Sequence, residues 1–169
     1  MRILGIDPGT ATTGYGLVTE SESGNLCTID YGVIQTPPGM PMPERLSYLY
    51  RRLQDIILLH KPESSAVEKL FFQRNVKTAL AVGQARGVAL LALAEAGLSI
   101  AEYSPMEVKQ AVAGYGGADK RQVQEMVKAL LGLREIPQPD DAADALAIAI
   151  CHLHTAHTAN QIQKSSSSL

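Results

Sequence analysis

The stretch that decides the fold lies near the start of the chain and reads Ile3-Leu4-Gly5-Ile6-Asp7-Pro8-Gly9. This apolar run closed by a Pro-Gly turn predicts a buried strand over residues 2–7. Residues 13–20 and 26–36 are rich in β-branched and aromatic side chains, and the turn-forming segment 21–25 separates them. That pattern predicts an antiparallel hairpin. The first 36 residues are therefore expected to form a three-stranded antiparallel meander.

Helices and strands are expected to alternate after the meander. Asn75 is the expected N-cap of a long helix, and Gly97 its C-terminal stop. The other expected elements are strands at 64–68 and 98–103 and helices at about 44–60, 105–113, 119–132 and 140–156. The middle of the last helix, 145–151, has no polar residue and should be buried all round. The order predicts an α/β fold, with a mixed five-stranded sheet of a meander plus parallel strands and helices on both faces.

Length and composition set further bounds. The chain has 169 residues, of which 46% are hydrophobic, enough for the core of one domain and too many for a disordered chain. No apolar run approaches the roughly 18 residues of a membrane span, and the two cysteines form no disulfide framework. We expect a soluble cytoplasmic protein with no membrane partner. Residues 1–157 are expected to form the domain, and the serine-rich segment 158–169 a flexible tail.

Two carboxylates fall at the ends of predicted strands. An acid that ends an apolar strand is costly unless it is paired, hydrogen-bonded or bound to a cation. Asp7 has a simple alternative role, because Asp-Pro-Gly is common turn chemistry, and spacing alone favours that role. Glu68 ends the strand Ser65-Ala66-Val67, where a small apolar residue would be expected, and is the better candidate for a site residue.

Three further carboxylates open the last helix, at Asp140, Asp141 and Asp144. Acids in a first turn are explained in part by capping and by the helix dipole, but three exceed that need. Because residues three or four apart share a helical face, Asp144 can pair with either Asp141 or Asp140. Asp140, directly after Pro139, is the better N-cap. Spacing leaves the choice between the two open.

Four carboxylates that converge at one edge of a sheet would repel one another unless hard cations held them. Mg²⁺ and Mn²⁺ prefer such oxygen ligands. Two such ions about 3.5–4 Å apart activate water and stabilise the leaving oxygen in phosphodiester cleavage. The histidines offer no competing site, since His152 and His154 point about 160° apart on a helix and are expected to be packed or on the surface.

Four motifs resemble the RuvC family of bacterial Holliday junction resolvases, in the ribonuclease H-like superfamily. The resemblance spans about residues 1–155, in the family's order and spacing. The first motif alone is weak, because sugar kinases and actin-type domains share a similar strand and turn. The motifs lie at 5–10 with Gly14-Tyr15-Gly16, at 83–87, at 123–127 and at 141–147.

The resemblance assigns roles to particular residues. The implied catalytic and metal-binding tetrad consists of Asp7, Glu68, Asp141 and Asp144. Some family members carry histidine at the position of Asp141. Phe71 falls where the family inserts an aromatic side chain among junction bases, and Lys109 and Lys120 fall at basic positions important for cleavage.

The implied activity is that of a Mg²⁺-dependent, structure-selective endodeoxyribonuclease. It resolves four-way DNA junctions in recombination and repair by paired symmetric nicks in strands of like polarity, with two metal ions per subunit and Mn²⁺ as a substitute. The family also implies a homodimer and a partnership with the RuvA–RuvB branch-migration complex. The small-residue stripe Ala79, Gly83 and Gly87 is a candidate dimer contact.

Three alternatives compete with this function. A related nuclease could act on structured RNA instead of DNA. A non-catalytic junction-binding scaffold would be expected to lack at least one of the four acids, and none is missing. An actin-like or sugar-kinase-like nucleotide-binding domain would need a second lobe, for which 169 residues leave no room.

The net charge first argues against a nucleic-acid partner, because 15 basic residues face 17 acidic ones. Setting aside the four proposed metal ligands leaves 13 acids against those 15 bases. The segment between Glu68 and Glu95 also contains no acid. Its bases are expected to form a rim that faces DNA, and they are Lys69, Arg74, Lys77 and Arg86. Arg74 and Lys77 are the two that we predict to contact DNA directly.

Overall fold

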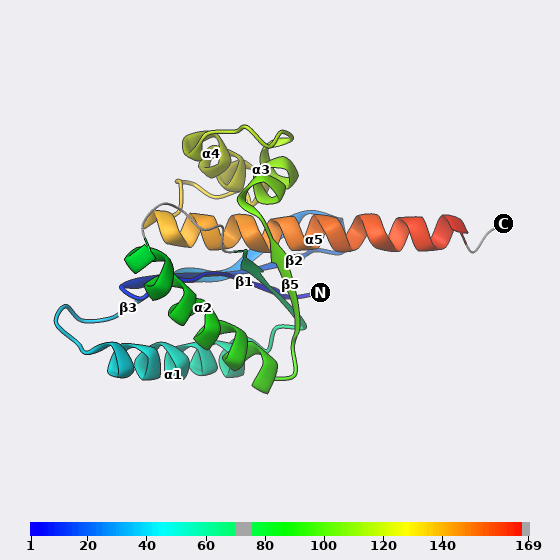
Figure 1. The fold of residues 1–169 in the computed structure, drawn as a ribbon. Coiled ribbons are helices and arrows are strands. Elements are labelled where there is room, and N and C mark those ends of the chain that lie inside the picture. Colours follow the sequence, from blue (N-terminus) through cyan, green and yellow to red (C-terminus); the bar gives the residue numbers. More distant parts are fainter. Residues whose placement is uncertain (70–75, 167–169) are drawn as a thin grey trace.

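The computed structural model describes residues 1–69 and 76–166 and is built on one mixed sheet (Figure 1). Its strand order is β3-β2-β1-β4-β5. The strands are β1 Ile3–Asp7, β2 Thr12–Glu20, β3 Leu26–Gln35, β4 Ser64–Glu68 and β5 Ser99–Tyr103. β1 pairs with β2, and β2 with β3, in antiparallel fashion, whereas β1 and β4, and β4 and β5, run parallel. The predicted fold class is confirmed.

Helices cover both faces of the sheet (Figure 1). They are α1 Met42–His60, α2 Val76–Glu95, α3 Pro105–Ala113, α4 Lys120–Leu130 and α5 Asp140–Ser166. Alternating residues of β1 point to opposite faces, so Leu4 and Ile6 pack with α1 and α2, whereas Ile3 packs with α5. Two separate apolar cores result, one on each face of the sheet. The site residues lie at the edge of the core that contains α5.

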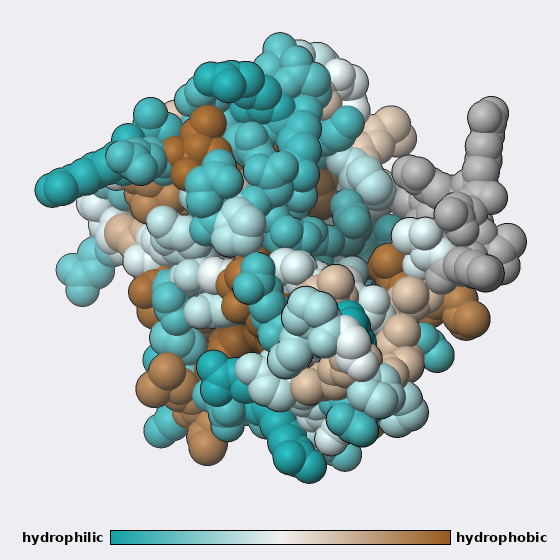
Figure 2. Space-filling model, turned by 90° about the vertical axis from the view of Figure 1, so that its left-hand side faces the viewer, coloured by the Kyte–Doolittle hydropathy of each residue, from teal (hydrophilic) through white to brown (hydrophobic). Residues whose placement is uncertain are grey.

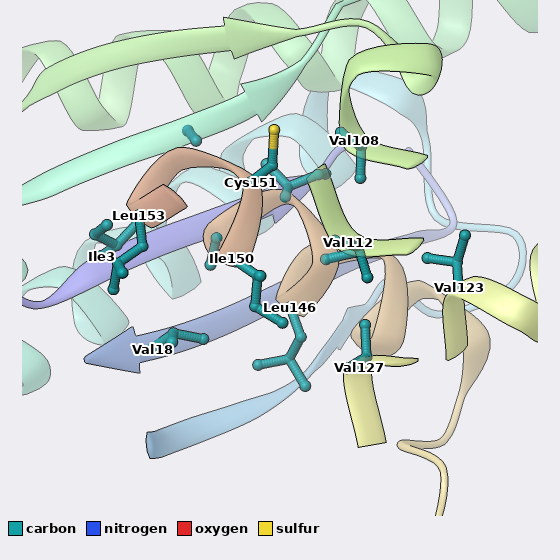
Figure 3. Packing of buried hydrophobic residues seen from close by; sticks show 14 of the residues in the cluster. Ile3, Val18, Val108, Val112, Val123, Val127, Leu146, Ile150, Cys151 and Leu153 are labelled. Carbon is teal, nitrogen blue, oxygen red and sulfur yellow. The ribbon is translucent and has the colours of Figure 1, made fainter. Parts of the chain in front are cut away.

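Helix α5 is enclosed between the sheet and the helices α3 and α4. Residues 145–151 are each at most 2% exposed, as predicted from their apolar sequence. Figure 3 shows valines of α3 and α4 on one side of α5 and Ile3 and Val18 of the sheet on the other. The helix approaches the sheet closely because a Cβ atom on Gly5 would lie 2.2 Å from the carbonyl oxygen of Ala145.

Gly5→Ala should therefore destabilise the protein by about 3 kcal/mol, because backbone atoms of α5 occupy the space a methyl group needs. Urea unfolding measures the change. Gly117→Ala is the matched control, since a Cβ there would meet only the Tyr115 ring at 3.7 Å and should change stability by less than about 0.5 kcal/mol. Equal effects of the two substitutions would contradict the close packing of α5.

The predicted boundaries agree with the structure at most elements, and one is wrong. Helix α5 continues to Ser166 instead of ending near 156. Residues 157–163 contain no glycine or proline to stop it, and the hydroxyl of Thr158 donates to the carbonyl of His154 one turn before. The flexibility of the serine-rich tail stays a prediction, and the predicted cap Asn75 lies outside the described residues. Within residues 1–69 and 76–166, no helix is long and apolar enough to span a membrane.

Candidate active site

Two of the predicted carboxylates meet because the strands that carry them are parallel neighbours. Asp7 ends β1 and Glu68 ends β4, and the residues just before them, Ile6 and Val67, are paired in register. Asp144, one turn into α5, faces the same space. All three side chains line a cleft of about 280 Å³ beyond the carboxyl ends of the strands. Parallel α/β sheets commonly carry their sites at this edge.

Two lysines line the other side of this cleft. Lys109 belongs to α3 and Lys120 is the first residue of α4. Both helices begin with a complete capping box, formed by Ser104 with Glu107 in α3 and by Asp119 with Gln122 in α4. These caps satisfy the free amides of each first turn and fix where the helices start. The cleft thus combines carboxylates from the sheet and α5 with ammonium groups from α3 and α4.

Asp141 lies near Asp7 but does not line the cleft. Its helical turn packs over Gly14, which is paired with Asp7 across the sheet. A Cβ atom at Gly14 would lie 1.9 Å from the carbonyl oxygen of Asp141. Glycine in β2 therefore lets Asp141 approach closely enough for its charge to raise the pKa of Asp7. The structure brings Asp141 toward the other three predicted ligands.

Asp140 faces away from that group, toward α4. The helix begins at Asp140 itself, so the expected N-cap role is wrong. Its carboxylate instead lies 3.1 Å from the Lys120 ammonium and accepts a hydrogen bond of 3.0 Å from the Gln124 amide. Neither Gln124 nor this use of Asp140 is predicted from the sequence. The sequence does carry a signal for these contacts, because each helix has two polar side chains four residues apart. They are Lys120 and Gln124 on α4, and Asp140 and Asp144 on α5.

The cleft carries uncompensated negative charge. Burial, followed by repulsion from the carboxylates of Glu68, Asp144 and Asp141, raises the pKa of Asp7 to about 8. Burial and the charge of Asp144 raise the pKa of Glu68, and burial raises that of Asp144 although Lys120 opposes it. The Lys120 ammonium lies 3.2 Å from Asp144, but its one positive charge does not balance the three carboxylates that line the cleft. A bound cation would relieve this repulsion.

The donor set suits a hard divalent ion, because every carboxylate of the group offers oxygen. Among the residues that the structure describes, no three histidine, cysteine, aspartate or glutamate side chains already enclose a metal position. The carboxylates would therefore draw together around an ion. His152 is not available to it, since its ring nitrogens bond Ser64 at 2.6 Å and Tyr103 at 2.8 Å. That histidine is half-buried, which is one of the two placements expected for it.

Arg86 of α2 contacts the last residue of β4. Its guanidinium donates to the Glu68 carbonyl at 3.3 Å and forms an ion pair with Glu102 on β5. The ion pair with Glu102 compensates the charge of Arg86, and the expected contribution of Arg86 to a DNA-facing rim stays a prediction. Lys69 is exposed beside the cleft. Phe71 and Arg74 lie outside the described residues, as does the side chain of Lys77, so their predicted DNA contacts stay predictions.

The end of the molecule at which α5 begins faces the viewer in Figure 2. Hydrophobic residues appear there as separate patches among hydrophilic ones. A polar surface around a carboxylate cleft with two lysines suits a phosphate-bearing substrate better than an apolar ligand.

Comparison with known proteins decides the family. The family model described as "Crossover junction endodeoxyribonuclease RuvC" matches residues 3–152. The chain belongs to the RuvC family. It is 66% identical over 158 residues to the crossover junction endodeoxyribonuclease RuvC of Chloroflexus aurantiacus, covering 94% of this chain and 96% of that protein. The enzyme of the same name from Desulfitobacterium hafniense is 59% identical over 162 residues, 96% of this chain and 98% of that protein.

Solved structures extend the RuvC match to the fold. T. thermophilus RuvC in complex with a Holliday junction substrate is 38% identical, with a TM-score of 0.85 over 94% of this chain and 96% of that one. The yeast mitochondrial Holliday junction resolvase Ydc2 is 18% identical with a TM-score of 0.67, a likeness of fold alone. The predicted resemblance and the ribonuclease H-like fold are thus confirmed.

Proposed function

We propose that this protein is a crossover junction endodeoxyribonuclease that hydrolyses phosphodiester bonds in four-way DNA junctions. The observation that carries the proposal is the cleft where Asp7, Glu68 and Asp144 converge opposite two lysines, in a chain of the RuvC family. A cytoplasmic location, where bacterial chromosomal DNA lies, follows from that activity.

Asp7, Glu68, Asp141 and Asp144 are the residues that would hold divalent ions, with Mg²⁺ as the expected ion, two per subunit, and Mn²⁺ as a substitute. When bound, such ions supply activation of water and stabilisation of the charge on the leaving oxygen. The raised pKa values of Asp7, Glu68 and Asp144 support the assignment. They show that the negative charges of these carboxylates are poorly compensated within the protein, and a bound cation would compensate them.

The protein's own groups would bind and orient the scissile strand. Lys109 and Lys120 extend from α3 and α4 over the cleft, where their ammonium groups can contact phosphate oxygens on either side of the reacting phosphodiester. Burial of the carboxylates by α5 and the sheet limits the water around the reacting group. Phe71, Arg74 and Lys77 are proposed to contact junction DNA beside Glu68.

A homodimer would place two such clefts symmetrically, as paired nicks in strands of like polarity require. Helix α2 supports this proposal with an exposed apolar face, on which Leu80 is 65% and Leu91 52% exposed. Gly87 lies between them on the same face, and a Cβ atom added there would meet no atom within 4 Å. Cooperation with the RuvA–RuvB complex is proposed from the family resemblance.

Cleavage assays on three substrates test the function. A synthetic four-way DNA junction, a linear duplex of the same sequence and a structured RNA are each incubated with the protein and Mg²⁺. We expect two symmetric nicks in the junction and at least about a hundredfold slower cutting of the other two, because only the junction fits a two-fold arrangement of clefts. Preferred cutting of RNA would support the alternative nuclease, and binding without cutting would support a scaffold.

A further inference from the structure

Helices α4 and α5 begin side by side at the edge of the cleft. Val123 and Val127 of α4 belong to the same apolar core as α5 (Figure 3) and join the two helices. Lys120 and Gln124 lie one turn apart on α4, and Asp140 and Asp144 lie one turn apart on α5. Because residues four apart share a helical face, the two pairs face each other across the junction of the helices.

The contacts among these four side chains form a chain. Gln124, only 9% exposed, donates its amide to Oδ1 of Asp140 at 3.0 Å. Oδ2 of Asp140 lies 3.1 Å from Nζ of Lys120. The same Nζ lies 3.2 Å from Oδ2 of Asp144. Asp140 thus has a protein partner on each oxygen and lies outside the cleft lining, unlike Asp7, Glu68 and Asp144.

Electrostatics separates Asp140 from the cleft carboxylates in the same way. Hydrogen bonds from Lys120 and Gln124 lower the pKa of Asp140, whereas the pKa values of the three cleft carboxylates are raised. Partial desolvation acts to lower the pKa of Lys120, but the bonds to Asp140 and the charge of Asp144 outweigh it and raise the value. The contacts of Asp140 with Lys120 at 3.1 Å and with Gln124 at 3.0 Å commit its charge to Lys120.

The lysine needs such a partner for two reasons. It is the first residue of α4, where the positive end of the helix dipole disfavours a cation. Its long side chain also loses much conformational freedom when the ammonium is held in one place. Because the Lys120–Asp140 pair is more than half exposed on both sides, it contributes little to folding stability, and its effect is on where the ammonium lies.

We propose that Asp140, itself held by Gln124, is a positioning residue that keeps the Lys120 ammonium over the cleft when Asp144 is released from it. Any cation bound by Asp144 competes with Lys120 for the same carboxylate. With Asp140 present, Lys120 keeps one anchor and stays beside the substrate phosphate. Without Asp140, Lys120 either remains on Asp144 and opposes the cation or leaves the cleft. This role in catalysis rests on the proposed function.

A double-mutant cycle tests whether Asp140 acts through Lys120. Asp140→Asn should lower kcat for junction cleavage about tenfold, with KM for the junction changed less than twofold. In a Lys120→Met background, the same substitution should change kcat less than twofold, because there is no ammonium left to position. Asp55→Asn, at an exposed aspartate of α1 paired with Arg52, is the charge-matched control and should leave kcat unchanged. Equal losses in both backgrounds would overturn the proposal.

A second readout needs no cleavage. The reaction of the Lys120 amine with an acetylating reagent is followed by mass spectrometry, with exposed Lys61 as internal reference. In wild type, Lys120 should stay protected with and without Mg²⁺. In Asp140→Asn it should react at least threefold faster with Mg²⁺ present, and in Gln124→Met the change should have the same direction. Unchanged reactivity in Asp140→Asn overturns the proposal. Should wild type cut no junction, the proposed function fails and this readout alone decides the positioning.

Discussion

Asp7→Asn is expected to lower the rate of junction cleavage at least about a thousandfold while junction binding persists. Asparagine keeps the shape of the side chain but removes one of the negative charges that would hold divalent ions. A thousandfold loss corresponds to about 4 kcal/mol of transition-state stabilisation, within reach of a lost metal-ion contribution. Single-turnover cleavage in Mg²⁺ measures the rate, and a gel-shift assay measures binding.

The same substitution should make the metal-free protein more stable. Asp7 is mostly buried beside three other carboxylates, and its raised pKa shows that the charged form is unfavourable in the fold. Removing that charge should increase the free energy of unfolding at pH 8 by about 2 kcal/mol, an example of stability given up for function. A loss of activity together with a gain in stability cannot arise from misfolding.

Asp55→Asn is the control for both measurements. Asp55 lies on α1, exposed and paired with Arg52, far in the fold from the cleft. Its replacement should alter neither cleavage nor, by more than about 0.5 kcal/mol, stability. If Asp7→Asn retained cleavage in Mg²⁺, Asp7 could not be a ligand of the catalytic ions.

Local sequence patterns predict the fold well where periodicity and turns decide the structure. The run from Ile3 to Asp7 and the hairpin after it predict the meander, and the apolar stretch from Ala145 to Cys151 predicts a helix enclosed on all sides. The end of α5 differs from the prediction because a serine-rich composition suggests a coil. No residue in 157–163 breaks a helix that the core has already nucleated.

Long-range partners explain what local patterns cannot predict about the site. Spacing could not choose between Asp140 and Asp141, because the choice depends on Lys120 and Gln124, which lie on another helix. The sequence groups Arg86 with the DNA-facing bases because its neighbours in sequence are uncharged or basic. Its partner, Glu102, lies on the adjacent strand β5, where only the fold brings it within reach.

The stability of the metal-free protein should fall as pH rises, in contrast to the rise that paired carboxylates usually give. The pKa of Asp7 is about 8 in the folded protein and 3.8 as its ordinary value. Between these values the folded state binds more protons than the unfolded state, so the stabilisation present below pH 4 is lost as pH rises to 8. Glu68 and Asp144, whose pKa values are also raised, act in the same direction.

The expected slope is about 1 kcal/mol of unfolding free energy per pH unit between pH 6.5 and 8, measured by urea unfolding in EDTA. His152 gives the opposite slope, because burial lowers its pKa, and this contribution fades as pH rises above its ordinary value of 6.5. Mg²⁺ should reverse the loss, and its stabilisation should be larger at pH 8 than at pH 6.5, since protonated carboxylates bind cations poorly. Asp7→Asn should reduce the pH dependence of the unfolding free energy and also the pH dependence of the stabilisation by Mg²⁺. A slope that Asp7→Asn leaves unchanged would assign the titration to other groups and remove the electrostatic argument for a cation in this cleft.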